Sequence, residues 1–452
     1  MVSTPHPSEP STTSAPPTRS TMTTATLSRP QLTAWRNAIF VVFALSGISL
    51  ASWVARLPTV RDNLGLDTAQ VGILIFAMSA GSVIGLVAAP PIMLRLGART
   101  GMVVALCLVA LGCVLIGLGT SVFFTAAVVA VGLALFGFGN GAVDVMMNVE
   151  GAAAERAIGK TLMPLMHAFY SFGTVAGAGL GALASLFAVP VAVHLSVIAA
   201  VIAVAALVAI RFVPRGAEAS EASGATEADA AGSSAAAAPR AGFRERLLGS
   251  LVVWKDLRLL AIGVIMLGMA FAEGSANDWL TLAVVDGYDQ SNTTGAVVFG
   301  LFTVSMTAGR VLGGPVLDRF GRVPVLRVSA LLGALGLAVF IFAPALAPMA
   351  PWIGYAGTVF WALGCSLGFP VGMSAAADND DPRVSAARVS AVAIIGYVAF
   401  LVGPPVIGLL GHEFGILNGL LLVLALVVLA GLASPAARER HPRPAVKPAA
   451  SA

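Results

Sequence analysis

Two apolar stretches of this sequence carry polar side chains at the spacing of a helix. In GFGNGAVDVMMN, the polar residues of one helical face are Asn140, Asp144 and Asn148. In the stretch that begins MHAFYSFG, one face holds His167, Tyr170, Ser171 and Thr174. A carboxylate is costly inside a lipid bilayer, and a nearby imidazole can exchange a proton with it. These residue types predict that Asp144, with His167 as its partner, couples the movement of a solute to that of a proton.

The position of these two residues in their segments supports the pairing. We take Glu150 and Lys160 as loop residues, which lie six positions after Asp144 and seven before His167. Both side chains are then roughly 10 Å inside the same end of the molecule. The alternatives are structural. Asp144 hydrogen-bonds to a neighbouring helix or lies at the membrane interface, and His167 is a packing residue.

A second set of polar groups lies in the segment FAEGSANDWLT. Glu273 and Asn277 share a helical face, and Asp278 lies beside them. Because Arg56 closes the first apolar segment, we expect it to pair with Glu273 or Asp278 near the outer face, or to belong to an interfacial charge cluster. We expect Arg310 to be structural and to reach the cytoplasmic face. Other side chains able either to contact a polar solute or simply to pack are Trp53, Tyr170, Asn277, Trp361 and Tyr397.

The elements that must position these residues are membrane-spanning helices. The chain is 58% hydrophobic and 11% charged, whereas a soluble chain is about 25% charged. Runs of about 20 apolar residues predict helices, because a spanning segment must satisfy its own backbone hydrogen bonds. We expect twelve, near 36–56, 69–94, 100–119, 122–149, 162–187, 190–213, 256–285, 293–317, 323–343, 349–377, 385–411 and 413–433.

A low-complexity Ala/Ser/Glu stretch divides these segments into two sets of six. The predicted parts are a disordered tail (1–30), a six-helix bundle (31–213), a cytoplasmic linker (214–250), a second six-helix bundle (251–434) and a cytoplasmic tail (435–452). Most Lys and Arg residues fall on one side of the membrane if both termini are cytoplasmic. This asymmetry explains the basic pI without a nucleic-acid partner. The excess of Arg over Lys suggests a bacterial plasma membrane.

The loop GPVLDRFGRV resembles a signature of the major facilitator superfamily. The matching residues of its G-x-x-x-D-R-x-G-R pattern are Gly314, Asp318, Arg319, Gly321 and Arg322. A partial copy, LRLGAR, stands at the corresponding place in the first half and keeps Arg95, Gly97 and Arg99, with Leu94 at the acidic position. The resemblance implies an all-α fold of twelve helices in two bundles. It also implies that these loops act as a cytoplasmic gate between the halves; for Arg95 and Arg99 the alternative is ordinary loop cations.

The stretches GFGNGAVDVMMN and MHAFYSFG resemble the fucose-permease-like branch of that superfamily. We find no GxxxxGK[ST] loop, no metal-binding cluster and no G-x-S-x-G motif, so we expect no cofactor, no metal and no enzyme activity. The prediction is a monomeric secondary transporter in the lipid bilayer, moving a small-molecule solute by alternating access with protons as the coupling ion, as in symport. The alternatives are a drug/proton efflux antiporter and a non-transporting membrane sensor or scaffold.

Overall fold

The computed structural model of the protein describes residues 27–160, 162–214, 256–346, 350–378 and 382–439. In these ranges, eleven helices are long and apolar enough to cross a membrane. The longest, α3 (Thr68–Ser121), contains two spans, because non-helical backbone at Gly97 interrupts it. The described part of the chain therefore holds the twelve predicted spans, and the prediction of an all-α membrane protein is confirmed.

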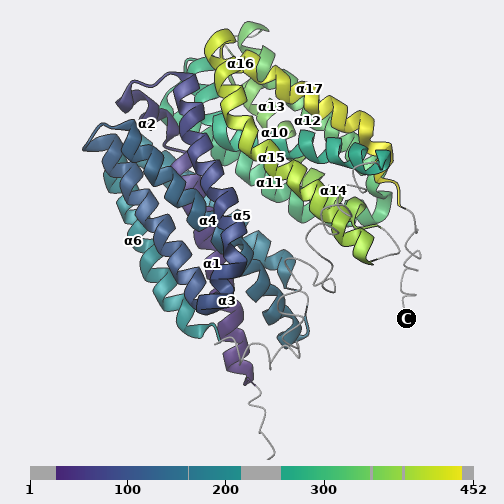
Figure 1. Ribbon diagram of the computed structural model, residues 1–452. Helices are drawn as coiled ribbons and strands as arrows, with labels where there is room; N and C mark the ends of the chain where they lie inside the picture. The colour runs from purple at the N-terminus through teal and green to yellow at the C-terminus, as the bar shows by residue number, and fades with distance from the viewer. Residues whose placement is uncertain (1–26, 161, 215–255, 347–349, 379–381, 440–452) are drawn as a thin grey trace, which may run out of the picture.

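These helices form two bundles, one from each half of the chain (Figure 1). The N-terminal bundle consists of α1 (Arg29–Val54), α2 (Leu57–Leu64), α3, α4 (Ala126–Ile158), α5 (Met163–Leu186) and α6 (Val191–Ala209). The C-terminal bundle consists of α10 (Leu257–Gly287), α11 (Asn292–Phe320), α12 (Arg322–Leu346), α13 (Trp352–Cys365), α14 (Gly368–Ala376), α15 (Pro382–Phe414), α16 (Ile416–Gly419) and α17 (Leu421–Ala433). Short 3₁₀ turns follow α6 (Ile210–Phe212) and α17 (Ser434–Ala437).

The two bundles meet at one end of the molecule. We call this the sealed end; it carries α2, the end of α10 and the start of α11. The opposite end, where α1 begins and α17 ends, is called the tail end. In Figure 1 the bundles converge toward the sealed end and diverge toward the tail end. At the sealed end, a Cβ atom on Gly72 of α3 would lie 3.1 Å from the carbonyl oxygen of Pro404 on α15.

Polar contacts also join the bundles at the sealed end. Arg61 of α2 forms an ion pair with Asp286 of α10. One residue farther along α2, Asp62 accepts a 3.1 Å hydrogen bond from the side-chain nitrogen of Asn292 at the start of α11. These contacts hold the sealed end closed in this conformation.

Glycine faces allow the helices within a bundle to approach closely. A Cβ atom on Gly173 of α5 would lie 2.2 Å from the carbonyl oxygen of Ala44 on α1, and one on Gly177 would lie 2.5 Å from that of Ile48. In lipid, such small-residue faces drive association through van der Waals contact rather than through the hydrophobic effect. The α1–α5 pair is therefore fixed in register, which positions the polar face of α5.

The two loops that carry the signature have the same backbone turn. Gly97 has φ 75° and ψ 155°, and Gly321 has φ 75° and ψ 171°. Residues with a Cβ atom rarely adopt this region, so glycine is required at both turns. The two halves therefore repeat each other at this point, as the partial sequence match predicts.

Three predicted segments lie mostly outside the described residues: the N-terminal tail (1–30), the linker (214–250) and the C-terminal tail (435–452). The domain boundaries drawn at them remain predictions.

The structure corrects the predicted depth of Asp144. Glu150 is not a loop residue: it lies inside α4, is 6% exposed, and accepts a 3.2 Å hydrogen bond from the indole nitrogen of Trp35. Because α4 continues to Ile158, Asp144 is about 21 Å from that end of the helix and not 10 Å. Asp144 thus lies near the middle of α4.

Candidate functional site

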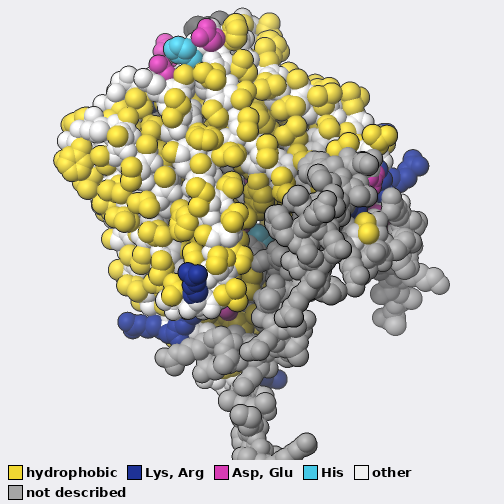
Figure 2. Space-filling view, viewed as in Figure 1, with side chains coloured by type: hydrophobic (Ala, Val, Ile, Leu, Met, Phe, Trp, Pro, Cys, Tyr) yellow, Lys and Arg dark blue, Asp and Glu magenta, His cyan; other side chains and the backbone are white. Residues whose placement is uncertain are grey.

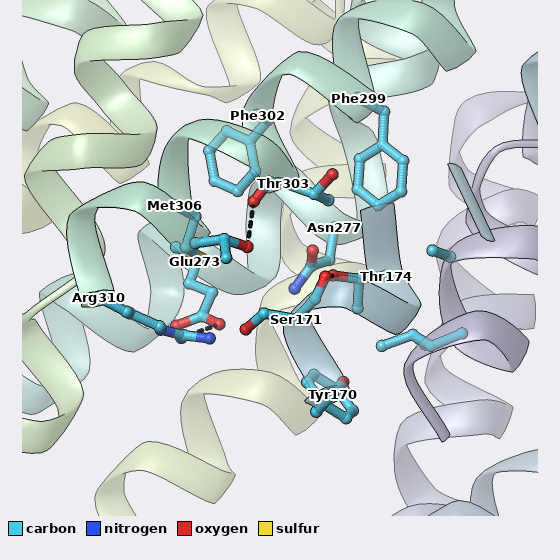
Figure 3. Close-up of a pocket in the computed structure, with 13 residues that line it drawn as sticks. Tyr170, Ser171, Thr174, Glu273, Asn277, Phe299, Phe302, Thr303, Met306 and Arg310 are labelled. Carbon is cyan, nitrogen blue, oxygen red and sulfur yellow. Dashed lines mark hydrogen bonds and ion pairs between the residues drawn. The ribbon is translucent and has the colours of Figure 1, made fainter. Parts of the chain in front are cut away.

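A narrow cavity lies between the two bundles, with about 40 Å³ of free space in this conformation. Four helices form its wall, α1 and α5 from one bundle and α10 and α11 from the other (Figure 3). The lining residues are Leu50, Ala51, Tyr170, Ser171, Thr174, Glu273, Asn277, Phe299, Phe302, Thr303, Met306, Thr307 and Arg310. A site shared by two halves of a repeat is where a secondary transporter holds its solute.

An ion pair forms the charged part of this wall. The guanidinium Nη2 of Arg310 on α11 lies 2.7 Å from Oε1 of Glu273 on α10. The Arg310 side chain is 34% exposed and that of Glu273 is 17% exposed. Because the pair is only partly desolvated, its charged groups remain open to a ligand in the cavity. In Figure 3 the Ser171 side chain, from the other bundle, points toward the pair.

This ion pair corrects two expectations. Glu273 pairs with Arg310 rather than with Arg56, and Arg310 lines the cavity rather than reaching the cytoplasmic face. The Arg56 side chain is 2% exposed and donates a 2.7 Å hydrogen bond to the carbonyl oxygen of Val189 within its own bundle. The side chain of Asp278 forms no hydrogen bond or ion pair with any residue in the described part of the chain.

The polar groups of the wall differ in what they offer a ligand. The hydroxyls of Thr174, Thr303 and Thr307 each donate to a carbonyl oxygen of their own helix, at 2.7 to 2.8 Å. Their oxygen lone pairs therefore remain as acceptors, whereas Asn277 and Arg310 supply N–H donors. Phe299 and Phe302 add aromatic faces. The chemistry of this wall thus suits a solute that has hydroxyl or amide groups together with a flat or apolar surface.

Asp144 and His167 are exposed side chains on facing helices of the N-terminal bundle, but they do not form the predicted pair. Neither a hydrogen bond nor an ion pair joins them among the described residues. Asp144 accepts from the Asn148 amide, through its backbone oxygen at 2.8 Å and through Oδ1 at 3.4 Å. The His167 ring packs edge-on against Phe43, with the ring centroids 5.2 Å apart.

Both residues are nevertheless near the gap between the bundles. Asp144 lies within electrostatic range of Tyr170 in the cavity wall and of Tyr397 on α15. His167 lies within electrostatic range of Arg310. The third residue of the predicted stripe on α4, Asn140, has a buried side-chain oxygen without a partner among the described residues.

The structure places two of the five predicted solute-contacting residues in the cavity wall, Tyr170 and Asn277. Trp53 and Trp361 are 1% and 0% exposed, so both are packing residues in this conformation. Trp361 supports the wall from behind, because its ring packs edge-on against Phe302 at 5.5 Å. Tyr397 is exposed but is not part of the cavity wall.

The predicted gate residues lie at the tail end, where the bundles are apart. Arg322 pairs with Asp378 at 3.1 Å and bonds to the Ser374 hydroxyl at 3.0 Å, both within the C-terminal bundle. The Arg319 guanidinium lies over the neighbouring Phe320 ring, 5.4 Å from its centroid. On the other bundle Arg95 is exposed. A gate that joins the two halves through these residues remains a prediction.

Helix α11 supplies a part of the site that was not predicted from the sequence. Its cavity-lining residues repeat every three or four positions: Phe299, Phe302, Thr303, Met306, Thr307 and Arg310. This spacing marks one helical face that mixes aromatic, hydroxyl and charged groups, a signal that could have been read from the sequence. In the part of the chain that the structure describes, no group of His, Cys, Asp or Glu residues is arranged to hold a metal ion.

Known proteins resemble the chain over most of its length. A transporter of Sinorhizobium fredii, named y4wD and described as uncharacterized, is 26% identical over 85% of this chain and 93% of its own. The structure is similar to that of the nucleoside transporter NupG, with a TM-score of 0.69, 15% identity, and coverage of 90% of this chain and 99% of the other. It is also similar to that of the Escherichia coli fucose:proton symporter FucP, in a variant form, with a TM-score of 0.56, 16% identity, and coverage of 89% of this chain and 98% of the other.

The family follows from a match across the whole sequence. A profile described as Major Facilitator Superfamily matches residues 2–157, 39–379 and 279–452. The twelve spans, the two bundles and the cavity between them agree with that match. The chain therefore belongs to the major facilitator superfamily, whose members are membrane transporters and not enzymes.

Proposed function

We propose that this protein is a proton-coupled secondary transporter that carries a small, uncharged polar solute through the cavity between its bundles. The observation that carries this proposal is the Arg310–Glu273 ion pair in a cavity wall to which both halves contribute. A solute bound there contacts both bundles at once. Its binding can then favour one relative position of the bundles over another, which is what alternating access requires.

The composition of the cavity wall supports an uncharged solute. Its one cation, Arg310, is balanced by Glu273, so a charged solute would face no net complementary charge. The three threonine hydroxyls, the Asn277 amide and the two phenylalanine rings suit a sugar-like or nucleoside-like molecule. The names of the structural neighbours, a nucleoside transporter and a fucose:proton symporter, agree with this class.

Asp144 is the residue that we propose to carry the coupling proton. It is an exposed carboxylate in the middle of a spanning helix, and it lies within electrostatic range of tyrosines in both bundles. An ionisable group at such a depth is retained for function by default, because placing it there is costly. Its position beside the cavity lets solute binding and proton binding influence each other.

We further propose that the tail end faces the cytoplasm of a bacterial cell and that the structure is inward-facing. Basic residues at the tail end include Arg95, Arg99, Arg156, Arg211, Arg319 and Arg322, whereas the sealed end carries only Arg56 and Arg61 of the described Arg and Lys residues, together with Asp62, Asp67 and Asp286. Figure 2 shows the same separation, with dark blue side chains toward the tail end and magenta and cyan ones at the sealed end. Positive residues gather on the cytoplasmic side of bacterial membrane proteins.

Uptake into liposomes tests the proposed function. The purified protein is reconstituted, and the entry of radiolabelled nucleosides and neutral sugars is measured with and without an inward proton gradient. A symporter accumulates one of these solutes only with the gradient. Exit of solute in exchange for protons would instead show an antiporter, and absence of flux for all tested solutes in both directions would contradict the proposal.

A further inference from the structure

At the sealed end of the N-terminal bundle, two buried side chains that carry nitrogen atoms able to donate hydrogen bonds lie close together. Arg56, at the junction of α1 and α2, is 2% exposed, and His194, in the first turn of α6, is 7% exposed. They are close enough to interact electrostatically. Neither forms an ion pair or a hydrogen bond with a carboxylate in the described part of the chain.

Most of the N–H groups in this cluster have no hydrogen-bond partner among the residues that the structure describes. Arg56 donates from Nη2 to the carbonyl oxygen of Val189, but its Nε and Nη1 atoms are unpartnered, as are both ring nitrogens of His194. The buried Ser52 hydroxyl, one turn before Arg56 on α1, is also unpartnered. A guanidinium stays protonated in proteins, so this is a buried positive charge with donor groups to spare.

Such an arrangement is unfavourable unless an anion balances it. An unpaired buried charge is strongly destabilising, and each unmade buried hydrogen bond adds to that cost. We propose that Arg56 and His194 form a binding site for a small monovalent inorganic anion such as chloride. The donors that would surround the anion are Nε and Nη1 of Arg56, one ring N–H of His194 and the Ser52 hydroxyl.

The proposed anion site lies next to the contacts that close the sealed end. Arg56 immediately precedes α2, and α2 carries Arg61 and Asp62, which contact the other bundle. A bound anion fixes the corner between α1 and α2 and so supports these contacts. The anion is a structural ion in this inference and not the transported solute, so the inference does not depend on the proposed function.

Thermal unfolding of the full-length protein in detergent tests the site. The unfolding midpoint is measured in sodium chloride and in sodium gluconate at equal ionic strength, since gluconate is too large for a buried site. For the wild type we expect a saturable rise of a few degrees with chloride, because a ligand that binds only the folded state stabilises it. Arg56→Gln should lose this response, and Arg36→Gln, on the same helix at the tail end, should keep it.

A diffraction measurement covers the case in which Arg56→Gln does not fold. Crystals of the wild type grown with bromide should show an anomalous peak within hydrogen-bond distance of Arg56 and His194, and His194→Leu should lower its height. Three results would each overturn the inference. The wild type could have equal unfolding midpoints in chloride and gluconate, or Arg56→Gln could keep the wild-type response to chloride. The crystals could also show only ordered water, without an anomalous peak, beside Arg56 and His194.

Discussion

Arg310 and Glu273 form a 2.7 Å ion pair between neighbouring helices, α11 and α10, of one bundle. Because both residues belong to the same half of the molecule, the pair moves as a unit when the halves move relative to each other. The opposite wall of the cavity comes from α1 and α5 of the other half. The pair can therefore meet the solute in every conformation that exposes the cavity.

Removing either charge of this pair should abolish transport. We expect Glu273→Gln and Arg310→Gln to lower uptake at least about tenfold, because a site that loses one hydrogen-bonding charge loses about 1.4 kcal/mol or more of solute binding. The measurement is initial-rate uptake in liposomes at several solute concentrations. As a control for structure, the double charge reversal Glu273→Arg with Arg310→Glu should recover thermal stability but not transport. Recovery of transport by the reversal would show that the pair is only structural.

Replacing Asp144 should separate solute movement from proton movement. In Asp144→Asn we expect the loss of uptake driven by a proton gradient, while exchange of labelled for unlabelled solute continues, because exchange needs no net proton transfer. The matched control is Glu150→Gln on the same helix. Glu150 is buried against Trp35 and away from the cavity wall, and an amide oxygen can still accept the indole N–H. Undiminished gradient-driven uptake in Asp144→Asn would exclude its role in coupling.

Weakening the sealed end should expose the cavity to the other side of the membrane. Asp286→Asn removes the charge that pairs with Arg61, and a partly exposed pair contributes about 0.2–1 kcal/mol. A cysteine placed at Thr303 should then react roughly 1.4 to 5 times faster with a membrane-impermeant thiol reagent added from the sealed end. Asp289→Asn is the control, since Asp289 is an exposed acid at the same end. An equal increase in both variants would attribute the effect to net charge.

A single methyl group should disrupt the packing of α3 on α4. A Cβ atom on Gly137 would lie 1.9 Å from the carbonyl oxygen of Met78, a backbone atom that cannot move aside cheaply. We expect Gly137→Ala to lower the free energy of unfolding by about 1–3 kcal/mol. Gly179→Ala, in a helix position with no atom within 4 Å of the added Cβ, should have little effect. Equal unfolding midpoints for the two variants would contradict the close contact.

The sequence predicted the helices well, because twenty apolar residues in a row leave little choice of structure. The turns at Gly97 and Gly321 could also be predicted, since each matches a short pattern of residues. The partners of the charged side chains could not be predicted from the sequence. The Arg310 side chain could extend toward the tail end or toward Glu273. The outcome depends on how α10 and α11 are rotated relative to each other, and the sequence of a single helix does not specify that rotation.

The predicted depth of Asp144 was wrong for a related reason. Glu150 is charged and follows a long apolar run, a pattern that predicts the start of a loop. In the structure it accepts a hydrogen bond from Trp35 on another helix and lies inside α4. Local sequence does not reveal such a partner. Helical periodicity did identify Tyr170, Glu273 and Asn277, because all three lie on polar faces of otherwise apolar helices.

The most direct test of the central claim, that a solute binds at the Arg310–Glu273 cavity and moves with protons, is uptake by wild-type and Arg310→Gln protein in liposomes with an inward proton gradient. We predict accumulation of a nucleoside or neutral sugar by the wild type, and loss of that accumulation both when the gradient is abolished and in the folded variant. Equal accumulation by the two proteins, or no movement of these solutes by the wild type, would contradict the claim.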